Sequence, residues 1–492
     1  MRWTIAMAAA LLACAPVQAQ AQAQWDAKPW LEDLEQVRAA FHAKYANREW
    51  LAKDREFDLD AALDRLGGRI RTAGSDAAAR ALFDRFAERI GDGHVEFRWP
   101  GPPPPARPAT APPAAPAPPP AATPASFCAR LGYDARQASA GLGPSLPGYA
   151  PDVSGQFLPS GLIAAGGERV GIVRIGVFQP QGYPMLCEDA VARLHVPLDK
   201  PCDDACDNAI LTAAYERLML AWEDRLHRLG AAGAGVLVVD VTGNGGGSEW
   251  TEAAARSLTA REIVSEPLGY VRGEHWVRHW RDLAASLRAA AKTASADDRG
   301  RLLRWASEAD AARVQAETTC DPATGCAWIA RAGYATGLVG SAAPGAFLHS
   351  DWGALVFSAG QYDYHPGSWS GPVIVLTDQE TWSAAEEFAA LLQDNRVAAI
   401  VGARTGGAGC GHTDGGTPTT LSHSGGVLQL PDCVRFRADG GNEVAGVIPD
   451  VLVPWRANDG AGFKSRLLVA ALPQAIARAR GLAKTPLEPS HR

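Results

Sequence analysis

Hydrophobic positions in the first hundred residues recur at the spacing of one face of a helix. Leu31 and Leu34 begin one such stripe, and similar stripes follow in residues 59–70 and 82–90. Apolar residues three or four positions apart lie on the same side of a helix and need a partner to cover them. The pattern therefore predicts three helices that pack as a small N-terminal bundle within residues 24–97.

Beyond residue 168 the pattern changes to short apolar runs that alternate with amphipathic segments. The runs fall at residues 170–177, 236–241, 373–376 and 397–401, and helical patterns fall at residues 208–229, 249–258 and 383–392. Continuous apolar runs bounded by turn residues are typical of strands buried on both faces. This alternation predicts an α/β fold with a mostly parallel sheet in residues 128–460.

Two helical additions to this core are expected. Residues 275–317 are rich in Ala, Arg and Leu, with turn chemistry only near residues 295–300, which predicts a helical-hairpin insertion. Residues 461–492 are expected to form a C-terminal helix and tail. Within the core, two strands lead through polar or Gly-rich loops into helices, which is where an open α/β sheet places its site.

Two segments do not fit a packed core. In residues 101–126, 21 of 26 positions are Pro or Ala, so residues 98–127 are predicted to be an extended, solvated linker. Residues 1–23 combine Arg2, an apolar run and small residues, which is typical of a secretory signal peptide. An alternative is lipidation at Cys14, which would hold the protein at a membrane.

Charge and hydropathy narrow the possible functions. The chain has 47 Lys and Arg against 54 Asp and Glu, a net charge of −7, which argues against a protein that binds a nucleic-acid backbone. After the leader, no apolar run reaches the roughly 20 residues that a membrane-spanning helix needs. We expect an exported protein, periplasmic or secreted, without a membrane span.

Eight cysteines follow the leader, an even number that predicts disulfides in an exported chain. Closeness in the sequence suggests that Cys320 pairs with Cys326, and Cys410 is expected to close a loop with Cys433. The remaining pairing stays open. Zinc at the Cys-x3-Cys pair of residues 202–206 is a weaker alternative, because no second close pair follows at the spacing of a zinc finger.

Ser383 is the first candidate for chemistry, because it stands where a predicted strand gives way to a helix. The free N–H groups at the start of a helix favour a developing oxyanion. A serine here can therefore act as a nucleophile while the Ala384 N–H stabilises the intermediate. A structural explanation competes, because Ser383-x-x-Glu386 is also a capping box in which the hydroxyl only caps the helix.

A run of glycines supplies a second element. Asn244-Gly245-Gly246-Gly247 follows the strand predicted to end at Val241. Adjacent glycines let backbone amides approach an anion closely, so Gly245 or Gly246 is a candidate second oxyanion donor. A flexible turn is the alternative, and the spacing matches no phosphate-binding loop.

His94 and Glu443 are candidates for the base and its partner. His94 sits in a Gly-rich turn between Asp92 and Glu96, and imidazole is the commonest base for a serine nucleophile at neutral pH. Glu443 lies in a late Gly-rich stretch and is a candidate to orient and charge-balance the imidazolium. A surface histidine and an ordinary glycine-rich hairpin would explain both without function.

These elements together resemble the C-terminal processing, or tail-specific, serine peptidase family. The resemblance is carried by Asp92-Gly93-His94, by Asp240 with the glycine run, by Ser383-Ala384-Ala385-Glu386 with Gly402-x-x-Thr405-x-Gly407, and by Glu443-x-x-Gly446-Val447-Ile448-Pro449-Asp450. It implies a crotonase-like α/β core with Ser383 as nucleophile. The implied oxyanion hole is formed by Ala384 and either Gly245 or Gly246, and we regard Glu386 as a supporting residue.

Departures from the family pattern point to one of its branches. The tail-specific branch uses a lysine about two dozen residues after the serine, but residues 406–411 contain none, and the stretch between the linker and Glu168 is too short for a PDZ domain. The chain is more similar to the branch with tricorn-core and retinoid-binding-protein-like members, in which a histidine in the position of His94 is the base and a late glutamate matches Glu443. Gly93 replaces a serine of the tricorn-like members, which leaves the role of Glu443 open.

The leading hypothesis is an exported serine peptidase that acts on peptide or protein substrates, with no cofactor, no metal and no nucleic-acid partner. The alternative is a non-catalytic protein that binds a peptide or an apolar ligand on the same scaffold. A zinc enzyme built on His275 and His279 is a third hypothesis, although Trp276 and Trp280 make an aromatic packing face the preferred interpretation. His412 is a reserve candidate for the base, and the sequence does not predict the oligomeric state.

Overall fold

The computed structural model describes residues 25–101, 123–152, 157–318, 320, 326–348 and 350–484. The predicted signal peptide, with Cys14, and most of the predicted linker lie outside these residues. Helix α5 (Pro124–Arg130) begins inside the range predicted as linker, with Thr123 as its N-cap.

The N-terminal segment forms four helices around one apolar cluster. They are α1 (Lys28–Lys44), α2 (Arg48–Lys53), α3 (Leu59–Ile70) and α4 (Asp76–Ile90). Asp58 and Ser75 cap the starts of α3 and α4, and Gly91, with φ 74°, ends α4 in a left-handed conformation. Phe41 and Phe83 are fully buried between the helices. The sequence pattern missed α2, because six residues are too few to show a helical period.

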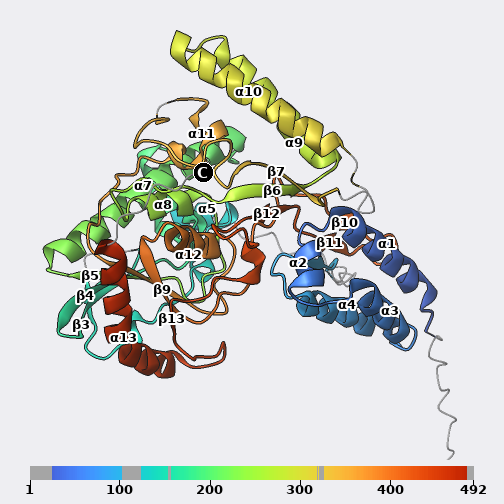
Figure 1. Cartoon of the computed structure of the whole chain (residues 1–492), viewed down its shortest axis with the longest axis horizontal. Coiled ribbons are helices and arrows are strands. Elements are labelled where there is room, and N and C mark those ends of the chain that lie inside the picture. The colour runs from blue at the N-terminus through green and yellow to red at the C-terminus, as the bar shows by residue number, and fades with distance from the viewer. Residues whose placement is uncertain are drawn as a thin grey trace, which may run out of the picture.

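A small antiparallel sheet joins this segment to the C-terminal half of the chain. β1 (Glu96–Arg98) pairs with β11 (Val427–Gln429), which also pairs with β10 (Thr419–Thr420). The blue helices therefore lie beside β10 and β11 in Figure 1. This pairing brings the turn with His94 to the core despite the long intervening sequence.

The central sheet has seven strands in the order β13-β9-β8-β5-β4-β3-β2. Their bounds are β2 (Ala150–Asp152), β3 (Ser160–Ala165), β4 (Glu168–Arg174), β5 (Val236–Asp240), β8 (Val373–Thr377), β9 (Ala398–Gly402) and β13 (Val451–Leu452). The four pairings β4–β5, β5–β8, β8–β9 and β9–β13 are parallel, whereas β2–β3 and β3–β4 are antiparallel. The predicted mostly parallel sheet is confirmed.

Helices cover both faces of this sheet (Figure 1). They are α6 (Pro184–Arg193), α7 (Asp204–Ala231), α8 (Trp250–Arg256), α12 (Ala384–Asp394) and α13 (Ala461–Lys484). Along β5, Leu237 and Val239 pack in a cluster with α7, α8 and α12, whereas Val236 and Val238 pack in a cluster with α13. Burial on both faces explains why β5 reads as a continuous apolar run.

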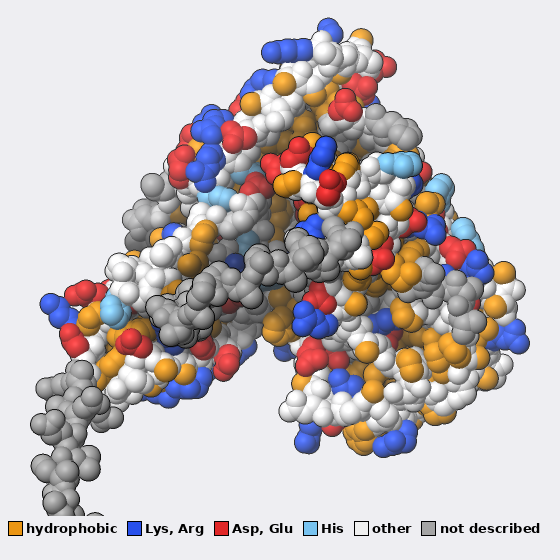
Figure 2. All heavy atoms as spheres, turned by 180° about the vertical axis from the view of Figure 1, so that it is seen from behind, with side chains coloured by type: hydrophobic (Ala, Val, Ile, Leu, Met, Phe, Trp, Pro, Cys, Tyr) orange, Lys and Arg blue, Asp and Glu red, His pale blue; other side chains and the backbone are white. Residues whose placement is uncertain are grey.

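Helices α9 (Glu274–Ala291) and α10 (Ala296–Glu317) occupy the residues for which a helical hairpin was predicted, and they project from the rest of the molecule in Figure 1. The hairpin leads out of a three-stranded antiparallel sheet of β12 (Cys433–Arg435), β6 (Pro267–Val271) and β7 (Ile329–Tyr334). A short helix, α11 (Gly353–Val356), follows. On the face that Figure 2 presents, acidic and basic side chains are interspersed.

Four disulfides connect the described cysteines: Cys128–Cys187, Cys202–Cys206, Cys320–Cys326 and Cys410–Cys433. The two pairs predicted from closeness in the sequence are confirmed. The pair at residues 202–206 is a disulfide, so the zinc alternative for those two thiols is wrong. Within the described ranges, no helix has the length and apolar character of a membrane span.

A buried ion pair fixes the end of β5. Asp240 is 1% exposed, and its Oδ1 accepts hydrogen bonds from Arg174 Nη1 (3.0 Å) and from the Thr242 N–H and hydroxyl. Its Oδ2 accepts from the Leu142 N–H (2.6 Å). The carboxylate therefore holds the start of the loop that carries the glycine run, as expected for a structural residue.

We expect Asp240→Ala to lower the free energy of unfolding by roughly 3–5 kcal/mol, because the Arg174 guanidinium would stay buried without its partner. Urea unfolding with the disulfides intact measures this change. Glu49→Ala is the control, since it removes an exposed ion pair with Lys53 and should leave the unfolding midpoint almost unchanged. An equal effect of the two substitutions would contradict the prediction.

Candidate active site

Two neighbouring strand ends bring the glycine run and Ser383 together. β5 and β8 are parallel, so the loops that follow them leave the same edge of the sheet. The Trp382 N–H donates to Asn244 O (2.9 Å), and the Gly243 N–H donates to Asp378 Oδ1 (2.8 Å). These bonds hold the two loops against each other at the start of α12.

Ser383 has an unusual backbone conformation, with φ 55° and ψ −122°. A positive φ is strained for a residue with a side chain, and such strain is concentrated at functional sites. Gly246 packs against it, since a Cβ on Gly246 would lie 2.8 Å from Ser383 Cβ. The Ser383 N–H donates to Glu386 Oε2 (3.2 Å). The close approach explains why this position in the glycine run has no side chain.

The backbone amides of the glycine run are not equivalent. The Gly246 N–H donates to Asn244 Oδ1 (2.8 Å), and the exposed Gly245 does not line the cavity that contains Ser383. Gly246 O and the Ser248 N–H both bond to Phe178, so the Gly247 N–H between them points away from Phe178. Gly247 lines the cavity, and its N–H has no hydrogen-bond partner among the described residues.

His94 is oriented by a backbone carbonyl. Its Nδ1 lies 2.6 Å from Ala408 O, and because a carbonyl only accepts, Nδ1 carries the proton and Nε2 is left as the basic nitrogen. Asp92 holds the turn, since its Oδ1 accepts from the His94 N–H (3.0 Å) and its Oδ2 from Tyr45 and Asn47. Glu96, on the other side, forms an ion pair with Arg98 at the surface.

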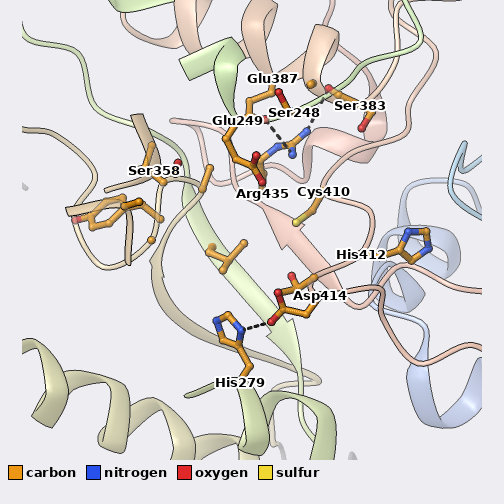
Figure 3. Close-up of a pocket in the computed structure, with 18 of the residues that line it drawn as sticks. Ser248, Glu249, His279, Ser358, Ser383, Glu387, Cys410, His412, Asp414 and Arg435 are labelled. Atoms are coloured by element: carbon orange, nitrogen blue, oxygen red, sulfur yellow. Dashed lines mark hydrogen bonds and ion pairs between the residues drawn. The ribbon is translucent and has the colours of Figure 1, made fainter. Parts of the chain in front are cut away.

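Ser383 and His94 line one cavity of about 550 Å³. Ala384 at the start of α12 also lines it, and the Ala384 N–H has no hydrogen-bond partner within the described ranges. No direct hydrogen bond joins the side chains of Ser383 and His94 in these described ranges. Figure 3 shows Ser383 with Arg435 at one end of the cavity and the pair of His279 and Asp414 at the other. The N-terminal segment and the core thus contribute to the same cavity.

Glu443 contacts Arg435 and not His94. Both carboxylate oxygens of Glu443, which is 1% exposed, accept from Arg435 (2.7 and 2.6 Å). Arg435 Nη2 also donates to Gly409 O (2.9 Å) and Ser383 O (3.4 Å). The predicted triad carboxylate is therefore connected to the backbone around Ser383 through a guanidinium, and the carbonyl of Ala408 takes the position on the imidazole.

More carboxylates than Arg435 can neutralise surround it. Glu387 and Glu266 are buried within 3.4 and 3.8 Å of its guanidinium. Burial raises the pKa of both carboxyls well above the usual value for glutamate. Burial likewise raises the pKa of Glu386 to about 7. Ser383 thus stands beside a cluster of buried carboxyl groups.

The side chain missing at Gly93 has a structural explanation. A Cβ at Gly93 would lie 3.0 Å from Ala408 Cβ and 3.3 Å from Trp382 Cε3. The Trp382 indole is fixed there by its Nε1–H bond to Gln379 O (2.8 Å). The space beside His94 that a serine would need is therefore filled by Trp382.

The other candidate histidines have different surroundings. The His412 ring lies 5.4 Å from the His94 ring, and burial lowers its pKa to about 4, so His412 is neutral at physiological pH. His275 Nε2 donates to Thr413 O, and His279 Nδ1 lies 2.7 Å from Asp414 Oδ2. Among the described residues, no group of three or more His, Cys, Asp and Glu could hold a metal ion.

The predicted aromatic face of the hairpin is present. Trp276 and Trp280 are buried and pack against Tyr270, with the Trp276 and Tyr270 rings stacked at 4.7 Å. His275 and His279 of the same helix contact Thr413 and Asp414, so they join the hairpin to the loop of residues 410–414, which borders His94.

Residues 219–453 match the sequence model of peptidase family S41. Over these residues, just under half of its length, the chain is similar to peptidase family S41. The match confirms the resemblance drawn from separate motifs, and the chain is a serine-type peptidase. The matched range includes Ser383 and Glu443 but not His94.

Solved structures with a similar fold cover most of the chain. Mature CPAF shares 15% identity, with 94% of this chain and 99% of CPAF covered and a TM-score of 0.57. Mature CPAF in complex with lactacystin also shares 15%, with 92% and 99% covered and a TM-score of 0.53. Among curated proteins, no significant match is found.

Asp432 anchors the loop that borders His94. Its Oδ1 accepts from the Thr413 N–H (3.1 Å), and its buried Oδ2 lies 3.3 Å from His275 Nε2 without accepting a hydrogen bond from a described residue. Burial raises the pKa of Asp432 to about 7.

We expect Asp432→Asn to remove a pH dependence of stability. The folded pKa of about 7 lies above the usual value of 3.8, so the contribution of Asp432 is fully present below about pH 4 and is lost as the pH rises to 7. The unfolding free energy of the wild type, relative to the variant, should fall by at most about 1.4 kcal/mol per pH unit in that window. Urea unfolding between pH 4 and 8 measures it, and a rising or constant difference would contradict the assignment.

Proposed function

We propose that the chain is an exported serine peptidase that hydrolyses peptide bonds through an acyl-enzyme on Ser383, with His94 as the base. The observation that carries the proposal is the shared cavity. It is lined by the strained Ser383, by His94, whose Nε2 is the basic ring nitrogen, and by Ala384, whose N–H has no hydrogen-bond partner among the described residues. These three groups supply the nucleophile, the base and the anion-stabilising dipole that acyl transfer needs.

The first step forms the acyl-enzyme. His94 Nε2 accepts the Ser383 hydroxyl proton as Oγ bonds to the substrate carbonyl carbon. The N–H groups of Ala384 and Gly247 stabilise the resulting oxyanion, because both residues line the cavity and neither N–H has an acceptor among the described residues. The tetrahedral intermediate then expels the amine, which takes the proton from His94. In the second step, a water molecule gives a proton to His94 as its oxygen attacks the ester carbon. The intermediate then releases the carboxylic acid product, and Ser383 Oγ takes the proton back from His94.

The surroundings of His94 suit this role. The Nδ1–H bond to Ala408 O fixes the tautomer that leaves Nε2 free, and the carbonyl dipole stabilises the imidazolium that forms. The two side chains close on each other when substrate fills the cavity, since catalytic hydrogen bonds are often long in empty sites. The family match does not favour the alternative of a non-catalytic binding protein.

The disulfides support export, and the family match supports a peptide or protein substrate. Four disulfides in the described residues are typical of an oxidising compartment, which agrees with the leader predicted in residues 1–23. Peptide or protein substrates follow from the family. The crotonase-like character of the core remains a prediction from the resemblance.

Ser383→Ala is expected to abolish both peptide hydrolysis and labelling by a fluorophosphonate probe, and His94→Ala to lower kcat by roughly 1,000-fold or more, as loss of a triad member does. Ser358→Ala is the matched control, because that hydroxyl lines the same cavity and has no hydrogen-bond partner among the described residues. Full labelling of the Ser383→Ala protein would refute the assignment of the nucleophile.

A crystal structure of the fluorophosphonate adduct tests the oxyanion hole. The phosphoryl oxygen should lie about 2.7–3.1 Å from the amide nitrogens of Ala384 and Gly247. The Gly246 N–H should keep its bond to Asn244. If the phosphoryl oxygen instead contacts the N–H of Gly245 or Gly246, the assignment of Gly247 is wrong, and the second donor is one of the two residues expected from the sequence.

A further inference from the structure

Glu386 makes more hydrogen bonds than any capping role requires. It lies three residues after Ser383 and is fully buried. Its carboxylate accepts from the N–H groups of Ser383 (3.2 Å), Gly407 (2.7 Å), Ala408 (2.6 Å) and Gly409 (3.3 Å), and from the Thr405 hydroxyl (2.5 Å). A single carboxylate therefore joins the backbone of Ser383 to the loop of residues 405–409.

Arg435 holds the same two backbone segments by their carbonyls. Its Nη2 donates to Gly409 O and Ser383 O, and Glu443 fixes the guanidinium from the other side. The N–H groups thus face the carboxyl oxygens of Glu386 and the carbonyls face the guanidinium of Arg435, which is the favourable arrangement for both sets of dipoles. We call Glu386 and Arg435 the backbone clamp.

The clamp determines the direction of the carbonyl that holds His94. Ala408 C=O and Gly409 N–H belong to one planar trans peptide, in which the two groups point in opposite directions. The N–H points to Glu386 Oε2 (3.3 Å), and the carbonyl points to His94 Nδ1 (2.6 Å). Turning this peptide away from Glu386 would also turn the acceptor away from the imidazole.

We propose that Glu386 is a positioning residue for the reaction, which fixes Ser383 and the orientation of His94 at once through the loop of residues 405–409. The proposal rests on the proposed function. A serine triad usually places a carboxylate directly on the imidazole. Here the carboxylate acts one peptide further away, and a backbone carbonyl transmits its effect to the ring.

Glu386→Gln tests this role, because the amide keeps the size of the side chain but turns one acceptor oxygen into a donor that faces N–H groups. We expect kcat for a peptide substrate to fall roughly 100-fold, as for a misplacement of the reacting groups by about 1 Å, with KM changed less than about twofold. Glu380→Gln is the matched control, since Glu380 is exposed and lies three residues before Ser383. It should keep wild-type kcat and KM.

A double-mutant cycle separates positioning from a merely structural role. If Glu386 acts through His94, Glu386→Gln should cost much less in a His94→Ala background than in the wild type. Equal losses in the two backgrounds would overturn the proposal. So would an unchanged kcat in the single variant.

A spectroscopic measurement needs no turnover. The His94 Nδ1–H should give a slowly exchanging, downfield proton signal in the wild type and in Glu380→Gln, and the signal should be lost in Glu386→Gln. Glu386→Asp, which keeps the carboxylate, should retain the signal and recover part of kcat, and it replaces Glu386→Gln if that variant does not fold.

A signal that survives in Glu386→Gln would refute the positioning role even if Ser383→Ala showed that the peptidase assignment is correct. Hydrolysis that survives Ser383→Ala would instead refute the proposed function.

Discussion

The hydrogen bond between His94 and Ala408 O is the interaction on which the site depends. Its two residues are separated by 314 positions in the sequence, so it forms only when the helical N-terminal segment is seated on the core. The pairing of β1 with β11 and the Gly93 N–H bond to Gly407 O provide that seating. The architecture around the sheet thus brings the His94 imidazole and the start of α12 to the same cavity.

Much of the fold could be predicted, because a strand that is buried on both faces of the sheet has a continuous run of apolar residues. Strands such as β5 and β8 are continuous apolar runs, and the junction that carries Ser383 follows from the change of period after β8. The short helix α2 left no such mark. Closeness in the sequence was enough for the pair of Cys320 and Cys326, whereas Cys128–Cys187 depends on tertiary packing that no local pattern records.

The candidate site was predictable in its residue types and less so in its contacts. Glu443 lies beside the site as expected, but sequence spacing could not show that Arg435 would stand between it and the reacting groups. The sequence alone cannot distinguish the three consecutive glycines at residues 245–247. The side chain of Asn244 accepts from the Gly246 N–H, and of the other two glycines only Gly247 lines the cavity, so tertiary features favour Gly247.

The order of assembly along the chain has a consequence for the growing polypeptide. The segment with His94 emerges first from the ribosome, but β11 and the Arg435 strand that complete its surroundings lie beyond residue 426. A nascent chain therefore carries the imidazole long before it carries a place to dock it. Under the proposed mechanism, hydrolytic competence arises only after the segment that ends at Arg435 has been synthesised and has docked against the N-terminal helices.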